Sequence, residues 1–240
     1  EIKLKPDQLE SLVASTIYSA GESDTRYTLN GLLFHIEGKR LIVVGTDGHR
    51  MALMESELEA AAPEEIKVIV PRKTASEVRK FLSTEEDVSV HIGKNHILFK
   101  IADVEFLARL IEGTYPNYHQ VIPEKNDKLV VMDREAVVKA LKRVSIMSRE
   151  RSNAVKVEIE PSLIKFTSTN PDLGEARDEV AVTYEGEALS AGFNARYLLD
   201  VLQAMSTEQV RFELHDQLSP TLLKEEGNEN YRCVVMPMRI

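Results

Sequence analysis

Residues 71–82 read PRKTASEVRKFL, and a segment of the same kind, NARYLLDVLQAM, occupies residues 194–205. Pro71 suits the first turn of a helix, and Asn194 is a favourable N-cap. Two further pairs of segments keep the same offset of about 122–126 residues: Asp7–Leu9 with Asp133–Glu135, and Glu86–Val88 with Glu208–Val210. A fixed offset of this kind indicates two tandem copies of one structural unit.

Each copy has the pattern of a helix, alternating strands, a basic helix and further alternating strands. The first helix is predicted from residues that recur on one helical face, namely Leu9, Leu12, Val13, Thr16, Ile17 and Ala20. The strands expected in the first copy are Tyr27–Glu37, Arg40–Val44, Val68–Val70, Val88–Ile92, His96–Ile101 and Phe106–Leu110, with a hairpin at 93–95. In the second copy we expect helices at 133–148 and 194–205, strands within 154–184, and strands from 208 to the C-terminus. The fold class is α+β, with two helices per copy packed on one face of antiparallel sheets.

The segment Glu112–Asp127 is the one turn-rich stretch long enough to join two domains. It contains a glycine, two prolines and two asparagines. A chain of 240 residues is long enough for two domains that each bury a core. We therefore expect one domain at residues 1–123 and a second at residues 124–240.

Charge is distributed unevenly along the chain. The net charge is −9, yet residues 70–82 and 133–151 each carry +3, so the remainder carries −15. Arg72 and Arg79 share one face of their helix, as do Lys73 and Lys80, and Lys139 and Lys142 lie opposite the apolar face of the other helix. A basic outer face is ordinary for one helix. Two such helices in an acidic chain favour a surface that faces a polyanion.

The composition and the other motifs limit the function. There is no apolar run of about 18 residues, no signal-peptide pattern and only one cysteine, Cys233, so a cytosolic compartment is the default. The chain does not begin with Met, and we expect it to be part of a longer protein. The histidines lack metal-ligand spacing, and no phosphate loop or nucleophile motif is present, which favours a binding protein over an enzyme.

Two apolar features are candidates for protein contacts. Ile146 falls on the charged side of its helix, with Met147 beside it. The C-terminal residues Met236–Arg239 contain two methionines and a proline, a composition suited to the wall of a binding groove, whereas Val234 is expected in the core.

Five motifs in order along the chain closely resemble the bacterial DNA polymerase III beta sliding clamp family. They are Arg26–Gly31, Thr46–Arg50, Val70–Lys73, Tyr115–Tyr118 and Val234–Arg239. The resemblance covers the second and third domains of that family, and the first domain is absent. It implies a DNA-clamp fold in which helices line a ring around duplex DNA and sheets form the rim. The ring tethers polymerase to DNA without catalysis, metal or cofactor, and its DNA contacts are independent of sequence.

The resemblance also implies which residues act. A groove for short Gln- and Leu/Phe-bearing peptides of polymerase, clamp loader and repair proteins would use Leu29, Thr46, Gly48, His49, Arg50, Met51, Pro116, Val121, Asn194, Tyr197, Leu218, Val234, Val235, Met236, Pro237, Met238 and Arg239. The expected DNA-facing residues are Arg26, Tyr27, Arg72, Lys73, Arg79, Lys80, Lys139, Lys142 and Arg143. Ile146 and Met147 match the family's dimer contact, whose partner lies on the absent first domain, so the family's homodimer is not expected for this chain.

Two alternatives remain open at this point. The chain could be a complete two-domain clamp that assembles as a trimeric ring. It could also be a nucleic-acid enzyme that uses Asp47 and His49, although neither a nucleophile nor a metal partner is evident.

Overall fold

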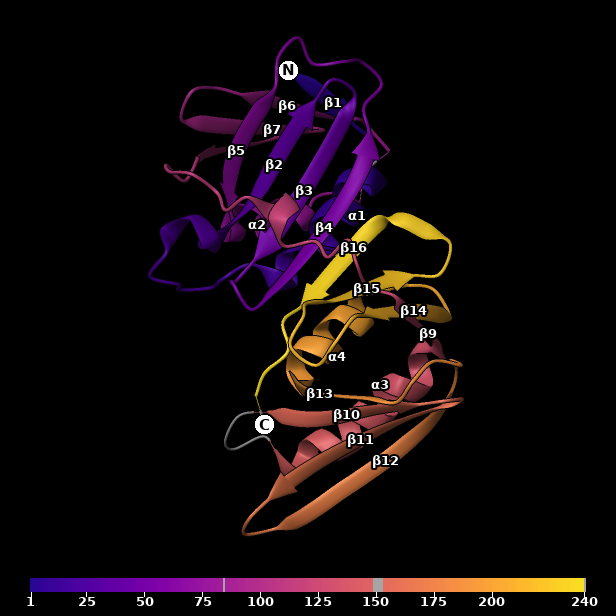
Figure 1. Ribbon diagram of the computed structural model, residues 1–240. Coiled ribbons are helices and arrows are strands. Elements are labelled where there is room, and N and C mark those ends of the chain that lie inside the picture. Colours follow the sequence, from indigo (N-terminus) through magenta and orange to yellow (C-terminus); the bar gives the residue numbers. More distant parts are fainter. Residues whose placement is uncertain (84, 149–152, 240) are drawn as a thin grey trace. The chain divides into compact units, whose positions relative to one another are not determined.

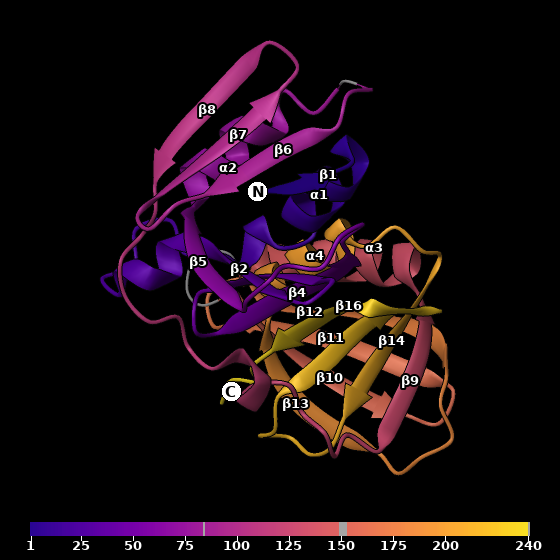
Figure 2. The ribbon, with the colours of Figure 1, turned by 90° about the horizontal axis from the view of Figure 1, so that it is seen from above.

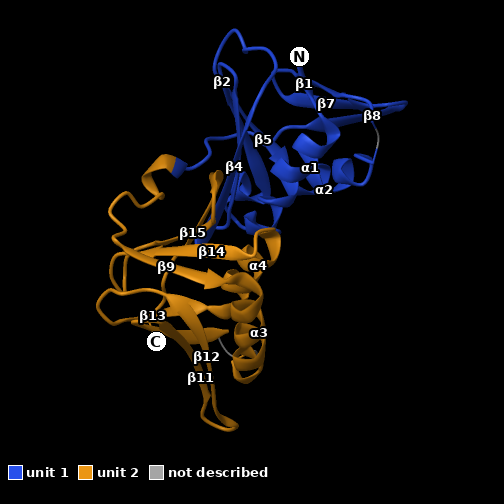
Figure 3. Ribbon diagram, turned by 90° about the vertical axis from the view of Figure 1, so that its right-hand side faces the viewer, with its two compact units in different colours: residues 1–118 blue, residues 119–240 orange. Residues whose placement is uncertain are grey.

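The computed structural model describes residues 1–83, 85–148 and 153–239, which form two compact units, Glu1–Tyr118 and His119–Ile240 (Figure 3). Each unit contains two successive segments with the same order of elements, a strand, a helix and then three strands. Each of the two copies recognised in the sequence therefore contains two smaller repeats. The α+β class and the two helices per copy are confirmed. No helix within the described residues is long and apolar enough to cross a membrane.

Unit 1 consists of two antiparallel sheets and a pair of helices (Figures 1 and 2). One sheet has the order β1-β6-β7-β8 and the other β4-β3-β2-β5. The elements are β1 (Ile2–Leu4), α1 (Pro6–Ala14), β2 (Gly31–Glu37), β3 (Arg40–Thr46), β4 (Arg50–Glu57), β5 (Ile66–Pro71), α2 (Arg72–Arg79), β6 (Val88–Ile92), β7 (His96–Ile101) and β8 (Val104–Arg109). Short 3-10 helices occur at η1 (Ile17–Ser19), η2 (Tyr27–Asn30) and η3 (Tyr118–Gln120).

The core of unit 1 lies between the helix pair and the two sheets. Leu9 and Leu12 of α1 and Val78 of α2 are at most 1% exposed, in one cluster with Phe34 of β2 and Phe99 of β7. Leu9, Leu12 and Val13 of the face predicted for the first helix are therefore confirmed as buried. The predicted helix is too long, because α1 ends at Ala14 and the chain continues as η1. Leucine, valine and phenylalanine side chains of this kind each contribute about 1.5–3 kcal/mol when they are fully buried.

The expected strand Tyr27–Glu37 is wrong at its beginning, because Tyr27–Asn30 forms η2. The Asn30 side chain accepts a hydrogen bond from the Asp24 N–H (2.8 Å) and donates one to the Asp24 carbonyl (2.9 Å). This closes a loop that turns the backbone away from an extended path. The strand starts at Gly31, where a Cβ atom would lie 2.6 Å from the Val70 carbonyl oxygen of the neighbouring strand.

The boundary between the units falls after Tyr118 rather than at 123/124, because the Tyr118 side chain is anchored in unit 1. Its hydroxyl lies 2.6 Å from His35 Nδ1, and His35 Nε2 lies 2.8 Å from Glu65 Oε1. Burial raises the pKa of the Tyr118 phenol to about 12. The composition of Glu112–Asp127 identifies the connection but does not reveal which of its side chains is buried.

Unit 2 repeats the same elements, with the strand order β13-β10-β11-β12-β9-β14-β15-β16. Strand β12 meets β9 only through Val182 and Thr183. The elements are β9 (Lys128–Asp133), α3 (Arg134–Val144), η4 (Ser145–Met147), β10 (Ala154–Glu160), β11 (Leu163–Asn170), β12 (Gly174–Thr183), β13 (Leu189–Asn194), α4 (Ala195–Ala204), β14 (Gln209–Leu214), β15 (Thr221–Glu225) and β16 (Asn228–Val235).

The helices of unit 2 begin where the sequence predicts. Asp133 caps α3 by accepting from the Ala136 N–H (2.7 Å), and Asn194 caps α4 by accepting from the N–H groups of Arg196 and Tyr197. The expected helix 133–148 is shorter, since α3 ends at Val144 and continues as the 3-10 helix η4. Arg149 and Arg151, which were counted in the basic segment, lie outside the described residues.

Glu225, at the end of β15, is a buried carboxylate that fastens the loop after α4. It is 5% exposed, and its Oε1 accepts from the N–H (2.5 Å) and the hydroxyl (2.9 Å) of Ser206. Its Oε2 accepts from the Asn228 side chain at 2.7 Å. Burial acts to raise the pKa of this carboxyl, but the hydrogen bonds together outweigh burial and hold the pKa below its usual value.

We expect Glu225→Gln to lower the free energy of unfolding by about 1–3 kcal/mol at pH 7. Because the folded pKa is depressed, the carboxylate stabilises the protein above the unfolded pKa of about 4.3, and this contribution is lost as the pH falls through the folded value. Urea unfolding followed by circular dichroism should therefore show the difference between variant and wild type shrinking below about pH 4. Glu185→Gln, at an exposed position, is the control. A difference that does not change with pH would contradict this account.

Candidate functional site

The turn between β3 and β4 is held by its own side chains. The Asp47 carboxylate accepts hydrogen bonds from the backbone N–H groups of His49 (2.9 Å) and Arg50 (3.0 Å). Thr46 Oγ1 donates to the Arg50 carbonyl (2.6 Å) and accepts from the Gly48 N–H (3.1 Å). Gly48 has φ +85°, a conformation that glycine adopts without strain. Asp47 therefore serves the turn, and the described residues contain no group of three or more His, Cys, Asp or Glu that could hold a metal ion.

Arg50 fastens this turn to the body of unit 1. Its side chain is only 10% exposed, and its Nε donates to Asp47 Oδ2 at 3.1 Å. Its Nη2 donates to the Tyr18 carbonyl at 2.7 Å, and the guanidinium lies 5.7 Å from the centre of the Tyr18 ring. The Tyr115 hydroxyl donates to the Val44 carbonyl of β3 at 3.2 Å, and burial raises the pKa of this phenol. The turn is thus presented in a fixed conformation.

Arg26, expected to face DNA, also braces this turn. Its Nη2 donates to the Asp47 carbonyl at 2.9 Å and to Asp24 Oδ2 at 2.7 Å, and its Nε donates to Asp24 Oδ1 at 3.0 Å. Hydrogen bonds from the Arg26 side chain and backbone lower the pKa of Asp24 to about 2. A Cβ atom on Gly48 would lie 2.7 Å from Arg26 Nη1, so a larger residue there would displace the arginine from its present position. Tyr27, by contrast, is 77% exposed and points into solvent.

The other expected groove residues of unit 1 divide between surface and core. Gly48, His49 and Pro116 are exposed. Leu29 and Met51 are 2% and 1% exposed, which places them beneath the surface as an apolar floor. The surface therefore combines a rigid turn with an apolar base.

In unit 2 the C-terminal segment leaves its sheet after Val235. Val234 and Val235 are fully buried in β16, whereas Met236 is 39% exposed. The Met238 N–H donates to the Gly192 carbonyl at 2.8 Å, which attaches the segment to strand β13. The expectation of a buried Val234 is confirmed, and Val235 lies beside it in the core.

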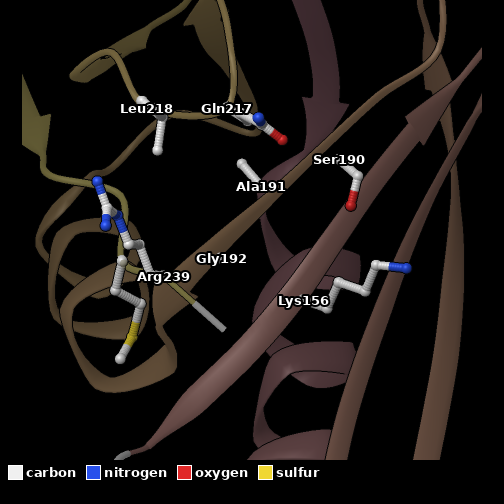
Figure 4. Close-up of a pocket in the computed structure, with 8 residues that line it drawn as sticks. Lys156, Ser190, Ala191, Gly192, Gln217, Leu218 and Arg239 are labelled. Atoms are coloured by element: carbon white, nitrogen blue, oxygen red, sulfur yellow. The ribbon is translucent and has the colours of Figure 1, made fainter.

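A cavity of about 500 Å³ opens beside this segment (Figure 4). Its walls are formed by β10, β13, the loop after β14 and the chain end: Lys156, Ser190, Ala191, Gly192, Gln217, Leu218, Met238 and Arg239. Leu218 is 59% exposed. The loop is shaped by Asp216, whose Oδ1 accepts from the N–H groups of Leu218 (2.8 Å) and Ser219 (2.7 Å). Of the remaining expected groove residues, Val121 and Tyr197 are half-buried, and Asn194 is the cap of α4.

Two models of the DNA polymerase III beta subunit match this chain, the central domain over residues 3–117 and the C-terminal domain over residues 119–239. The chain belongs to the DNA polymerase III beta subunit family. The beta sliding clamp of Pseudomonas putida is 40% identical over 238 residues, which is 99% of this chain and 65% of that protein. The expected family is confirmed, and the trimeric two-domain alternative is set aside.

Solved structures of beta subunits have the same fold. The DNA polymerase sliding clamp from Pseudomonas aeruginosa with ligand superposes with a TM-score of 0.97 at 37% identity, covering 99% of this chain and 65% of that chain. A sliding clamp of the same organism bound to griselimycin gives a TM-score of 0.96 at 37% identity, with the same coverage. The chain thus spans about 65% of the length of these relatives.

The basic residues of this beta subunit chain fall into two groups. Arg72 pairs with Glu22 and donates to the Ile17 carbonyl (3.2 Å), and Arg79 pairs with Glu10 at 2.6 Å; both side chains are largely covered. Arg143 pairs with Asp178 at 2.5 Å. The lysines at the other expected positions are exposed: Lys73, Lys80, Lys139 and Lys142. Lys80 and Lys139 pair with Glu77 and Glu135 on their own helices, contacts that contribute little at a surface.

Ile146 and Met147 lie on η4, at the end of α3. Ile146 is 61% exposed, as the helical pattern predicts, and Met147 is half-buried. An exposed isoleucine supported by a partly buried methionine is consistent with a contact surface, and the assignment of a ring interface stays a prediction.

Sequence reasoning missed the residues that support the site. Tyr18 and Asp24 hold the turn of unit 1, and Lys156, Ser190 and Gln217 line the cavity of unit 2. Arg26 and Tyr27 were predicted to face DNA, and this prediction did not indicate that Asp24 would pair with Arg26. Strand β13 was not among the expected strands, and with it the inner wall of the cavity was missed.

Proposed function

We propose that this chain is the part of a replicative sliding clamp that docks partner peptides and faces DNA. In this role it holds polymerase and other partners at duplex DNA without performing chemistry itself. The observation that carries the proposal is family membership together with two surface elements, the braced turn at Thr46–Arg50 in unit 1 and the segment Met236–Arg239 in unit 2. The benefit to replication is a high effective concentration of polymerase at the primer end.

Each of the two elements has chemistry suited to binding a peptide. Arg50 and Asp47 fix the turn in advance of binding, which reduces the entropy lost when a peptide docks. Met236 is exposed and Met238 half-exposed, and methionine side chains adapt to the varied shapes of apolar partners. A member of the family from Pseudomonas aeruginosa was solved bound to griselimycin, which shows that relatives accept a ligand.

The DNA-facing role is best carried by the exposed lysines, Lys73, Lys80, Lys139 and Lys142. All four side chains are exposed, and Lys80 and Lys139 pair only with acids of their own helices. Arg72 and Arg79 are largely covered and pair with Glu22 and Glu10 of other segments, whereas Arg143 is exposed but pairs with Asp178 of β12. Contacts of this kind to phosphates are independent of sequence and weaken with salt. Such a protein acts in the bacterial cytoplasm in association with nucleoid DNA.

Titration of a fluorescent hexapeptide that contains Gln and a Leu-Phe pair tests the proposal directly. We expect saturable binding in the micromolar range, competed by the unlabelled peptide, because short linear motifs bury little area. A peptide with the Gln, Leu and Phe replaced by Ala serves as the matched control. Equal binding of the two peptides, or no binding of either, would remove the peptide site from this surface.

Ring formation gives a second prediction. The expected partner of Ile146 and Met147 belongs to the family's first domain, so the 240-residue chain should not close a ring by itself. Native mass spectrometry should show mainly monomer, and the chain should not remain on closed circular DNA after a wash with about 0.5 M salt, which screens phosphate contacts. A closed assembly retained on circular DNA under those conditions would show this prediction to be wrong.

A further inference from the structure

The arginines expected to face DNA share one property, an ion pair with a carboxylate outside their own helix. The pairs are Arg26–Asp24, Arg72–Glu22, Arg79–Glu10 and Arg143–Asp178. The lysines expected to face DNA differ from them. Within residues 1–83, 85–148 and 153–239, Lys73 and Lys142 pair with no carboxylate, and the acids that pair with the other two lie on the same helices. The fold therefore neutralises the arginines and leaves the lysines accessible.

This division matters because arginine and lysine contact a phosphate differently. A guanidinium is a planar fork that can hold two oxygens of one phosphate, whereas an ammonium acts as a point charge on a flexible stem. A DNA contact made by lysines alone is therefore weaker and less fixed in position than one that includes arginines. Carboxylates that occupy the arginines keep the DNA contact weak.

Glu22 is the most accessible of these carboxylates. It lies on the loop between η1 and η2, and its side chain is 77% exposed, whereas those of the other three acids are 40% exposed or less. Its Oε1 accepts a hydrogen bond from Arg72 Nη1. Arg72 is held from its other side, because its Nε donates to the Ile17 carbonyl at 3.2 Å. The guanidinium is thus anchored at η1, and the acid that covers it is open to solvent.

We propose that Glu22 is an intramolecular competitor of the DNA backbone, whose carboxylate occupies the Arg72 guanidinium and withholds this arginine from phosphate. Carboxylate and phosphate oxygens are equivalent charged acceptors for a guanidinium, so one can take the place of the other. Because Glu22 belongs to the same chain as Arg72, its effective concentration there is high compared with that of a weakly bound phosphate. The inference rests on the proposed DNA-facing role and adds a residue that limits the strength of the DNA contact.

Glu22→Gln tests the inference, because it removes the charge at an exposed position and keeps the size of the side chain. Fluorescence anisotropy measures binding of the 240-residue chain to a labelled duplex of about 20 base pairs over a range of salt concentrations. We expect the variant to bind about threefold more tightly than wild type at about 50 mM salt, the scale of an exposed ion pair. The slope of log affinity against log salt should steepen by about 0.9, the value for one more phosphate contact.

Control variants separate this effect from a change in net charge. Glu64→Gln removes the same charge from an exposed position before β5, whereas Arg72 follows β5, so the two residues lie about 20 Å apart along the strand. Glu64→Gln should leave the salt slope unchanged. In an Arg72→Gln background, Glu22→Gln should give no gain, because the guanidinium that it releases is absent. Independently of that background, heteronuclear NMR should show the Arg72 Nε–H signal shifting with duplex in Glu22→Gln and not in wild type.

The outcomes separate the two proposals. If wild type binds the duplex and Glu22→Gln binds it with the same affinity and salt slope, the role of Glu22 is refuted and the DNA-facing role stands. If Glu64→Gln gives the same gain, or if the gain persists without Arg72, the effect is one of net charge and the role of Glu22 is refuted. If no form of the chain binds the duplex, the DNA-facing role fails, and the role of Glu22 fails with it.

Discussion

Replacing Met236 and Met238 together with alanine is expected to weaken binding of the hexapeptide by about 10- to 100-fold. Truncation of two methionines removes apolar contact with the peptide, at about 0.8 kcal/mol for each buried methylene group. The fold should be preserved, because Met236 is 39% exposed and the adjacent Val234 and Val235 hold β16 in the core. Anisotropy titrations of wild type and variant measure the change.

The matched control is Met147→Ala, which removes a half-buried methionine from η4, outside the expected groove. It should leave the peptide affinity within about twofold of wild type, a change smaller than that of one methylene group. If the double variant binds the peptide as well as wild type does, the segment Met236–Arg239 is not part of the binding surface.

Arg50→Ala is expected to have the largest effect on unit 1. The guanidinium is 10% exposed and its Asp47 partner 18%, and the removal of one partner leaves a largely buried carboxylate without its cation. We expect a loss of about 2–4 kcal/mol in the free energy of unfolding of unit 1 and no measurable peptide binding, because the turn loses its anchor to Tyr18. Arg50→Lys should restore only part of the stability of unit 1 and of the peptide binding, because an ammonium cannot reproduce the contacts that a planar guanidinium makes.

Arg40→Ala separates the role of Arg50 from a general effect of charge. Arg40 pairs with Glu55 on the same strands, but its side chain is 52% exposed, so its loss should change stability by less than about 1 kcal/mol. Reactivity of the single cysteine, buried Cys233 in β16, reports on unit 2 in each variant and should stay low. Similar instability of both arginine variants would show that the turn is not specifically braced by Arg50.

Helical structure was predictable because it is encoded locally. The spacing of Leu9 and Leu12, or of Val137 and Leu141, places apolar side chains on one face whatever surrounds the helix, and these are the buried faces. Asn194 could be recognised as a cap for the same reason. Tyr27–Asn30 was misjudged because its 3-10 turn depends on hydrogen bonds between Asn30 and Asp24, which an alternating pattern does not reveal.

Only the parts of the candidate site that contain sequence motifs could be predicted. The motifs at Thr46–Arg50 and Met236–Arg239 indicated surfaces, but not that Arg26 would be drawn into the turn by Asp24 and the Asp47 carbonyl. Likewise, a helical wheel treats all basic residues on one face alike. Arg72 and Arg79 are nevertheless paired with Glu22 and Glu10, acids supplied by segments far away in the sequence.

The sequence by itself determined the tandem repeat, the α+β class and the family, because each rests on local periodicity or on motifs in order along the chain. The tertiary structure alone decided which charges are neutralised and that Ser190, Leu218 and Arg239 line one cavity. The physical reason is that these properties depend on pairing between strands and on contacts between distant residues, whose partners no local pattern specifies.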